Sequence, residues 1–193
     1  MSFYSFAKFI VTGALKPIYR FEVIGQENIP REGPVILCSN HISMMDPVAL
    51  GITSPRPISF MAKEELFKIP LLSQIIKALY AFPVKRGKGD RAALRTGLQI
   101  LREGRVFGIF PEGTRNKSGK LGRGLSGVGF FALKTDAAVV PCAIIGPYKP
   151  FRTVRVVYGK PIDMQALKEK KASAKEATQV IMAHIQEILI QYK

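Results

Sequence analysis

The sequence has 193 residues, which is enough for one well-buried domain and short for two. Its hydrophobic fraction of 47% excludes a disordered chain. The 29 Lys and Arg against 14 Asp and Glu give a formal net charge of +15, which indicates attraction to a nucleic acid, an anionic membrane surface or a phosphate-bearing substrate.

The N-terminal segment, residues 3–15, is apolar nearly all round. It is too short to cross a bilayer, which takes about 20 helical residues. It also lacks the basic start and small-residue cleavage site of a signal peptide. Two interpretations remain, a helix packed into the core and a helix lying in the membrane interface. We favour residues 1–19 as a membrane-interface helical segment ahead of a domain over residues 20–193, because basic residues flank it at Lys8, Lys16 and Arg20.

After this segment, short β-branched runs alternate with helical patterns. The runs typical of strands are 21–24, 35–39, 58–62, 81–85, 106–110, 138–145 and 154–158. The patterns typical of helices are 47–53, 70–80, 91–103, 126–135 and an amphipathic stretch at 173–192. This alternation predicts an α/β fold, a single domain with a mostly parallel, helix-covered sheet. In such folds the chemistry usually sits at the carboxyl ends of the strands.

The two cysteines, Cys38 and Cys142, both lie in apolar, strand-like runs. This position predicts two buried thiols rather than a disulfide. The chain has only two histidines, and no cluster of Cys, His and acidic residues has the spacing of metal ligands. We therefore expect no metal and no cofactor.

His41 and Asp46 lie just after the strand predicted at 35–39. A histidine side chain ordinarily has a pKa near neutrality, so it can take up and return a proton at working pH. A carboxylate five residues further on can accept from Nδ1–H, which fixes the tautomer and leaves Nε2 as the base. The structural alternative is that Asp46 caps the helix beginning at Pro47, and that His41 is a hydrogen-bonded core residue. The spacing alone does not choose between these interpretations.

The pair belongs to a set of four blocks. The blocks are Asn40-His41 with Asp46-Pro47, then residues 82–87, 110–115 and 140–144. In this order and at these separations, they resemble the glycerolipid acyltransferases, and most closely the small bacterial 1-acylglycerol-3-phosphate acyltransferases. The resemblance covers about residues 20–160, so it extends over most of the predicted domain.

The resemblance implies a role for each block. His41 would be the general base on the acceptor hydroxyl, with Asp46 orienting it. The phosphate of the acceptor would be contacted by Lys85, Arg86, Glu112, Gly113, Thr114 and Arg115. Most of these lie in two basic stretches without acids, 66–89 and 113–135, and arginine suits bidentate phosphate contacts. Val140 and Pro141 would lie on the acyl-donor side, although a buried strand with a fixed turn explains them equally well.

The implied function is transfer of a fatty acyl group from acyl-CoA or acyl-carrier protein to the sn-2 hydroxyl of 1-acylglycerol-3-phosphate (lysophosphatidate). The product is phosphatidic acid, made in phospholipid biosynthesis. Glycerol-3-phosphate or another lysolipid is the alternative acceptor, and a hydrolytic relative in which His41 activates water is chemically close. Residues 20–193 would be the acyltransferase catalytic domain.

The implied location is the cytoplasmic face of the cell membrane, where a peripheral or monotopic protein would hold its positive surface against anionic lipid. A non-enzymatic basic nucleic-acid-binding domain is a remote alternative. The chain has no Trp, and its basic blocks carry few aromatic residues for stacking on bases. We therefore expect no nucleic acid as partner.

Overall fold

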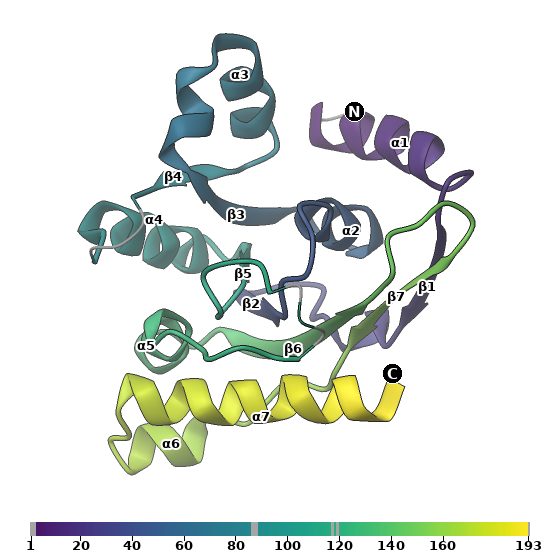
Figure 1. Cartoon of the computed structure of the whole chain (residues 1–193). Helices are drawn as coiled ribbons and strands as arrows, with labels where there is room; N and C mark the ends of the chain where they lie inside the picture. The colour runs from purple at the N-terminus through teal and green to yellow at the C-terminus, as the bar shows by residue number, and fades with distance from the viewer. Residues whose placement is uncertain (1–2, 86–88, 117, 119, 193) are drawn as a thin grey trace.

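A computed structural model of the chain describes residues 3–85, 89–116, 118 and 120–192 (Figure 1). Within these residues seven strands form one sheet in the order β1-β7-β6-β2-β5-β3-β4. The strands are β1 (Arg20–Ile24), β2 (Val35–Ser39), β3 (Ile58–Lys63), β4 (Phe82–Val84), β5 (Val106–Ile109), β6 (Ala138–Ile145) and β7 (Thr153–Tyr158). The prediction of one α/β domain with a mostly parallel sheet is confirmed.

The direction of the strands decides where the loops meet. β2 is parallel to both β5 and β6, and β3 is parallel to both β5 and β4. β7 runs antiparallel to β6 and parallel to β1, so it and β1 are reversed relative to the other five. The carboxyl ends of β2 to β6 therefore share one edge of the sheet, as the alternating pattern predicts.

The helices begin and end close to the predicted bounds. They are α1 (Phe3–Leu15), α2 (Asp46–Thr53), α3 (Pro70–Ala78), α4 (Arg91–Arg102), α5 (Gly127–Lys134), α6 (Gln165–Glu169) and α7 (Ala174–Tyr192), with short 3-10 helices η1 (Gln26–Asn28) and η2 (Glu64–Lys68). Side chains set two starts. Asp90 accepts from the first amides of α4, and Ser173 and Glu176 exchange hydrogen bonds at the start of α7. The sequence pattern did not predict α6 or the 3-10 helices.

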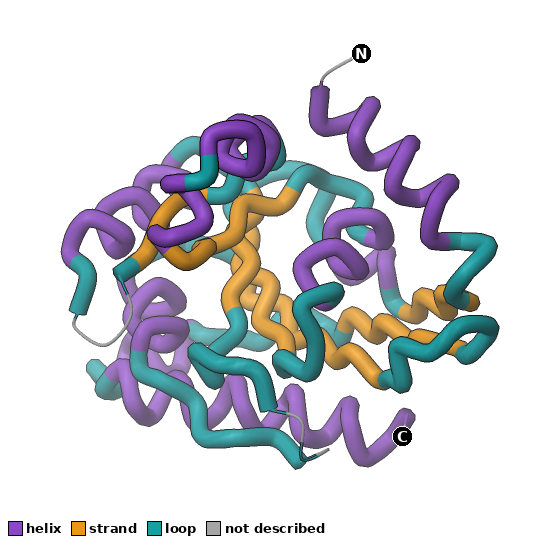
Figure 2. The backbone as a smooth tube through the Cα atoms, turned by 45° about the horizontal axis from the view of Figure 1, so that its top comes forward, coloured by secondary structure: helices purple, strands orange, loops and turns teal. Residues whose placement is uncertain are grey.

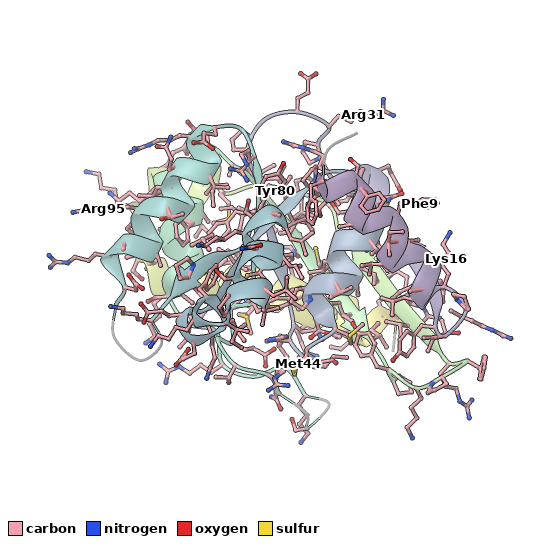
Figure 3. All side chains as sticks on the ribbon, turned by 90° about the horizontal axis from the view of Figure 1, so that it is seen from above. Phe9, Lys16, Arg31, Met44, Tyr80 and Arg95 are labelled. Atoms are coloured by element: carbon pink, nitrogen blue, oxygen red, sulfur yellow. The ribbon has the colours of Figure 1, made fainter. Side chains whose placement is uncertain are left out.

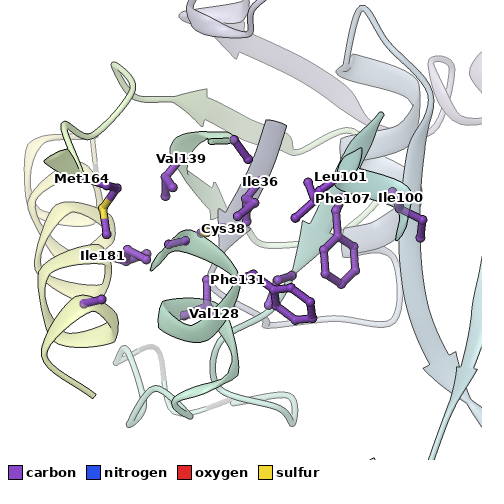
Figure 4. Packing of buried hydrophobic residues seen from close by; sticks show 14 of the residues in the cluster. Ile36, Cys38, Ile100, Leu101, Phe107, Val128, Phe131, Val139, Met164 and Ile181 are labelled. Atoms are coloured by element: carbon purple, nitrogen blue, oxygen red, sulfur yellow. The ribbon is translucent and has the colours of Figure 1, made fainter. Parts of the chain in front are cut away.

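Two hydrophobic layers lie on opposite faces of the sheet because side chains alternate along each strand. On β2, Ile36 and Cys38 face the cluster formed with α4, α5 and α7, which Figure 4 shows from close by. Val35 and Leu37 face the other cluster, which includes residues of α2. Both faces of β2 are fully buried, which explains why this strand reads as a continuous apolar run. Figure 2 shows the strands passing through the middle of the molecule between the helices.

The N-terminal helix α1 packs against α2 on the same side of the sheet. Tyr4 is its one buried residue, and the Tyr4 hydroxyl lies 3.4 Å from the amide nitrogen of Ile58. Lys8 was predicted as a basic flank of a membrane-facing segment, but its ammonium points inward and donates to the carbonyl of Ser54 at 2.5 Å. In the described part of the chain, no helix is both long and apolar enough to cross a membrane.

Candidate active site

Asn40 fixes the chain where β2 leaves the sheet. It follows the last residue of β2 and is nearly fully buried. Its side-chain amide donates to the carbonyl of Ile144 at 2.9 Å and accepts from the amide of Ile144 at 2.7 Å. The side chain thus continues the pairing of β2 with β6 by one step after the backbone ladder ends. Because both bonds are buried, the next residue, His41, leaves the sheet in a defined direction.

The side chains of His41 and Asp46 are in contact, as the spacing predicts. The Nδ1 atom of His41 lies 2.7 Å from Oδ2 of Asp46, and Asp46 is fully buried while 12% of the His41 side chain is exposed. The same Oδ2 accepts from the amides of Ile42 at 2.6 Å and Ser43 at 2.7 Å. With Asp46 on Nδ1, the proton-accepting nitrogen is Nε2. The turn between His41 and Asp46 is therefore held by hydrogen bonds to the Asp46 carboxylate.

Asp46 does not cap the helix in the way the structural alternative supposed. It is the first residue of α2, and the residue before it, Met45, makes no side-chain capping bond. The carboxylate is directed back to the loop amides and His41 instead of forward to α2. Its fixed position follows from these bonds, because a buried carboxylate needs several donors.

A tyrosine that the sequence pattern did not single out completes the surroundings of Asp46. The Tyr148 hydroxyl donates to Oδ1 of Asp46 at 2.9 Å, from the segment that follows β6. Burial, together with the charge of Asp46, raises the pKa of Tyr148 far above its ordinary value. The phenol is therefore a neutral donor at any working pH. No local signal pointed to it, because 102 positions separate the two residues.

Two phenylalanines form an aromatic stack beside the histidine. The His41 ring stacks on Phe110 with centroids 4.1 Å apart, and Phe110 stacks on Phe60 at 5.7 Å. Phe60 comes from β3 and Phe110 follows β5 directly. The stack hinders the imidazole ring from tilting away from Phe110 and shields one face of the ring from water.

Glu112 holds the backbone of His41 in the structure. Its Oε1 accepts from the amide of His41 at 2.9 Å, and its Oε2 accepts from the amide of Gly122 at 2.8 Å. The carbonyl of His41 in turn accepts from the amide of Asn116 at 2.7 Å. Both carboxylate oxygens are thus engaged, and a carboxylate repels a phosphate. These bonds position His41, and the implied contact of Glu112 with the acceptor phosphate stays a prediction.

The remaining residues of the predicted phosphate site are placed differently from one another. Gly113 has a φ of +68° and donates its amide to the carbonyl of Phe110 at 3.0 Å, so it shapes the turn. Thr114 and Arg115 follow it and are exposed. Lys85 follows β4 at the same edge, with its ammonium 3.7 Å from the carboxylate of Glu64 and 71% exposed. Arg86 lies outside the described residues.

Val140 and Pro141 lie inside β6. Val140 pairs with Leu37 and is fully buried, and Pro141 pairs with Cys38. Both residues are thus part of a buried strand, and their place on the acyl-donor side stays a prediction. Cys38 and Cys142 are free and buried as predicted, and burial raises the pKa of both thiols, so neither is a thiolate nucleophile. Among the described residues, no group of three or more His, Cys, Asp or Glu could hold a metal ion.

The His41–Asp46 pair lies at the carboxyl edge of the parallel strands, next to exposed cations. Such a pair is suited to remove a proton from a hydroxyl, and the cations are suited to attract an anionic acceptor that carries this hydroxyl. Residues 20–145 match the family model described as Acyltransferase. This match spans more than half of the chain, and the protein belongs to the acyltransferase family.

Relatives with this family's activity in their names are similar to the chain. A 1-acyl-sn-glycerol-3-phosphate acyltransferase of Borreliella burgdorferi is 36% identical over 63% of this chain and 50% of its own length. A chloroplastic one from Arabidopsis thaliana is 32% identical over 81% of this chain and 47% of its own. One from Bacillus subtilis is 34% identical over 65% of this chain and 63% of its own length. The chain thus spans about half to under two thirds of the length of these relatives.

A solved structure supports the same fold. The crystal structure of the 1-acyl-sn-glycerophosphate (LPA) acyltransferase PlsC from Thermotoga maritima aligns with a TM-score of 0.77 at 26% identity. The alignment covers 96% of this chain and 79% of that chain. The likeness therefore extends over nearly the whole chain, beyond residues 20–145 of the family match.

Proposed function

We propose that the protein transfers a fatty acyl group from a thioester to the sn-2 hydroxyl of 1-acylglycerol-3-phosphate, giving phosphatidic acid. The observation that carries this proposal is the buried Asp46 on Nδ1 of His41, at the sheet edge where the exposed Arg115 and Lys85 also lie. The names of three relatives that are 32–36% identical point to the same acceptor.

The proposed step begins when the acceptor hydroxyl gives its proton to Nε2 of His41. As this O–H bond breaks, the oxygen forms a bond to the thioester carbonyl carbon, and Asp46 stabilises the imidazolium. The tetrahedral oxyanion then collapses, the C–S bond breaks, and the leaving thiolate recovers the proton from His41. The donor is acyl-CoA or acyl-carrier protein, and neither a covalent enzyme intermediate nor a cofactor is required.

Arg115, with Lys85, is proposed to hold the acceptor phosphate. An exposed guanidinium can bind two phosphate oxygens at once, and in the described structure Glu112 is turned away into the loop. The same grip would accept glycerol-3-phosphate or another lysolipid. A side-by-side assay with these acceptors measures which one gives the highest kcat/KM.

We also propose that the protein lies on the anionic, cytoplasmic face of the membrane as a peripheral or monotopic protein. The outward side of α1 supports this, since Phe3, Phe6, Phe9 and Ile10 are all more than half exposed. Aromatic and aliphatic side chains on one helix surface favour the bilayer interface, and the +15 charge favours anionic lipid.

The test is conversion of lysophosphatidate and a radiolabelled acyl thioester to phosphatidic acid. We expect His41→Ala to lower kcat by about a thousandfold. His184→Ala is the matched control, because His184 lies on α7 and pairs only with the neighbouring Glu187 among the described contacts. Near-normal transfer by His41→Ala would refute the role of the base, and free fatty acid as the main product would indicate hydrolysis.

A further inference from the structure

The helix α3 presents its apolar side to solvent. Its only buried residue is Ser73, whereas Leu71 is 72% exposed and Ile75 is 41% exposed. Leu71 and Ile75 are four positions apart, so their side chains lie on one face of the helix. Ile69, just before α3, is also half-exposed. A helix of a water-soluble domain normally buries its apolar face, whereas α3 leaves part of that face in solvent.

The outward side of α1 has the same character and lies at the same end of the molecule. Figure 1 shows α1 and α3 together at the top, with α7 at the opposite side of the sheet. Figure 3 looks down on this end and shows Phe9 on α1 and Tyr80 just after α3. Phe9 is 69% exposed. Two apolar helices therefore turn exposed side chains away from the same sheet.

An aromatic contact joins the two helices. Tyr4 of α1 stacks on Tyr80 with centroids 5.5 Å apart, and the guanidinium of Arg105 lies 4.7 Å above the Tyr80 ring. Tyr80 has a φ of +62°, at a position after a helix where glycine is usual. This left-handed backbone costs a non-glycine residue about 1 kcal/mol or more. The tyrosine side chain offsets that cost through these contacts, which hold α1 and α3 relative to each other.

The charges around this end favour an anionic bilayer as the occupant. Neither helix contains an acidic residue. Three lysines there are exposed: Lys16 follows α1, Lys68 precedes α3, and Lys77 lies in the last turn of α3. The neighbouring acids are Glu64 and Glu65 in η2, and the carboxylate of Glu64 lies 3.7 Å from the ammonium of Lys85. Apolar side chains bordered by lysines match the acyl region and headgroups of anionic lipid.

We propose that α3 is a second membrane-binding helix, whose exposed apolar face enters the interface of an anionic bilayer together with that of α1. This inference rests on the proposed function, in which the acceptor is a membrane lipid. Two contacts separated along the surface fix the orientation of the protein on the membrane, which one helix cannot do. The edge of the sheet with His41 is then held at a constant angle to the bilayer.

The experiment uses single tryptophans as reporters, because the natural sequence contains none. Leu71→Trp places one on α3, and Phe9→Trp places one on α1. Ile190→Trp on α7 is the matched control, because Ile190 is exposed to the same 72% as Leu71. Fluorescence is measured in buffer and with vesicles of phosphatidylcholine containing phosphatidylglycerol, with brominated acyl chains as the quencher.

We expect the Leu71→Trp and Phe9→Trp emissions to shift to the blue and to be quenched with these vesicles, and the Ile190→Trp emission to stay unchanged. A shift for Phe9→Trp without one for Leu71→Trp would overturn the proposal, because α1 alone would then bind. A concentration-dependent shift of Leu71→Trp without vesicles would also overturn it, because a second copy of the chain would cover α3. Absence of any shift would do the same.

A functional measurement separates this proposal from the proposed activity. The double variant Leu71→Gln, Ile75→Gln is compared with wild type on vesicle-borne acceptor and on a monomeric, short-chain acceptor. We expect the ratio of vesicle to monomer activity to fall about tenfold, since two exposed apolar anchors are lost. An equal fall with both acceptors would overturn the membrane role. Absence of transfer by wild type, with Leu71→Trp still entering vesicles, would refute the activity alone.

Discussion

Two groups of residues at the same edge of the sheet are built in opposite ways. The acid–base corner (His41, Asp46 and Tyr148) is largely buried, and both oxygens of its carboxylate accept hydrogen bonds. The rim proposed to bind phosphate (Lys85, Thr114 and Arg115; the phosphate rim) is exposed. Removing a donor or acceptor from the corner leaves a buried polar group without a partner, whereas water replaces a lost contact at the rim.

The difference matches the tasks proposed for the two groups. Proton transfer depends on a distance and an angle that must be correct before the substrate arrives, so the corner is fixed by the surrounding fold. Phosphate attraction acts over a longer range and tolerates a mobile cation, so the rim can remain in water until the acceptor binds. We therefore expect substitutions in the corner to lower kcat, and substitutions at the rim to raise KM for the acceptor.

Asp46→Asn is expected to have the largest effect of the substitutions that test this comparison. The asparagine side chain would place its NH2 group against groups that are themselves hydrogen-bond donors. These are the backbone amides of Ile42 and Ser43 or, in the other orientation, the hydroxyl of Tyr148. It also removes the charge that stabilises the imidazolium. We expect kcat to fall about a thousandfold with little change in KM for lysophosphatidate. Asp136→Asn is the control, because Asp136 is fully exposed beside Lys168; steady-state kinetics that show equal losses for both would contradict the assignment.

Glu112→Gln tests whether this residue serves the corner or the rim. Glutamine has one acceptor oxygen, so the amide of either His41 or Gly122 loses its partner. A buried donor without a partner costs about 1–3 kcal/mol, which predicts a decrease in kcat of about tenfold to a hundredfold. Thermal unfolding should show a lower midpoint. Glu27→Gln, at an exposed carboxylate on η1, is the control.

The KM for the acceptor decides between the two roles of Glu112. A carboxylate next to the bound phosphate would repel it, so its neutralisation would lower KM. We expect KM to stay within about twofold, because in the structure both oxygens of Glu112 are engaged by backbone amides. A lower KM with an unchanged kcat would return Glu112 to the phosphate site.

The sequence predicted the parts of the molecule that depend on local patterns. The strand 35–39 could be recognised because its buried residues form a continuous apolar run, and the His41–Asp46 pair because its members are five positions apart. The corner also needed residues that only folding brings near. Ile144 comes from β6 and Tyr148 from the segment after it, and Gly122 reaches Glu112 across a loop.

Asn40 and α3 show why some features stay hidden in one sequence. Asn40 could have been noticed as a buried amide directly after an apolar strand, but its partner Ile144 depends on the pairing of β2 with β6. The apolar residues of α3 correctly predicted a helix, yet the same periodicity fits a helix that faces the core and one that faces outward. Only the packed structure shows that Ser73 is its buried side chain.

Arg115→Lys tests the rim with its charge preserved. Lysine is a point charge on a flexible stem and cannot bind two phosphate oxygens in the fixed geometry of a guanidinium. We expect KM for lysophosphatidate to rise about tenfold, with kcat changed by less than about twofold. Arg95→Lys is the matched control on the exposed surface of α4. If initial-rate measurements show no change in KM for Arg115→Lys, a bidentate contact by Arg115 is excluded.

Tyr148→Phe is expected to have the smallest effect, and its pH profile identifies the mechanism. Loss of the hydroxyl removes one donor from Oδ1 of Asp46, while the three donors to Oδ2 keep the carboxylate in place. Turnover should therefore fall only about threefold to tenfold. With one donor fewer, the carboxylate carries more effective negative charge and favours the protonated imidazole. The acidic limb of the kcat/KM profile should consequently move to higher pH by a few tenths of a unit. Tyr158→Phe removes another buried hydroxyl, which contacts Thr53 at 2.7 Å, and should leave that limb unchanged. A lower rate without a shifted limb would mean that Tyr148 supports the loop and does not act through Asp46.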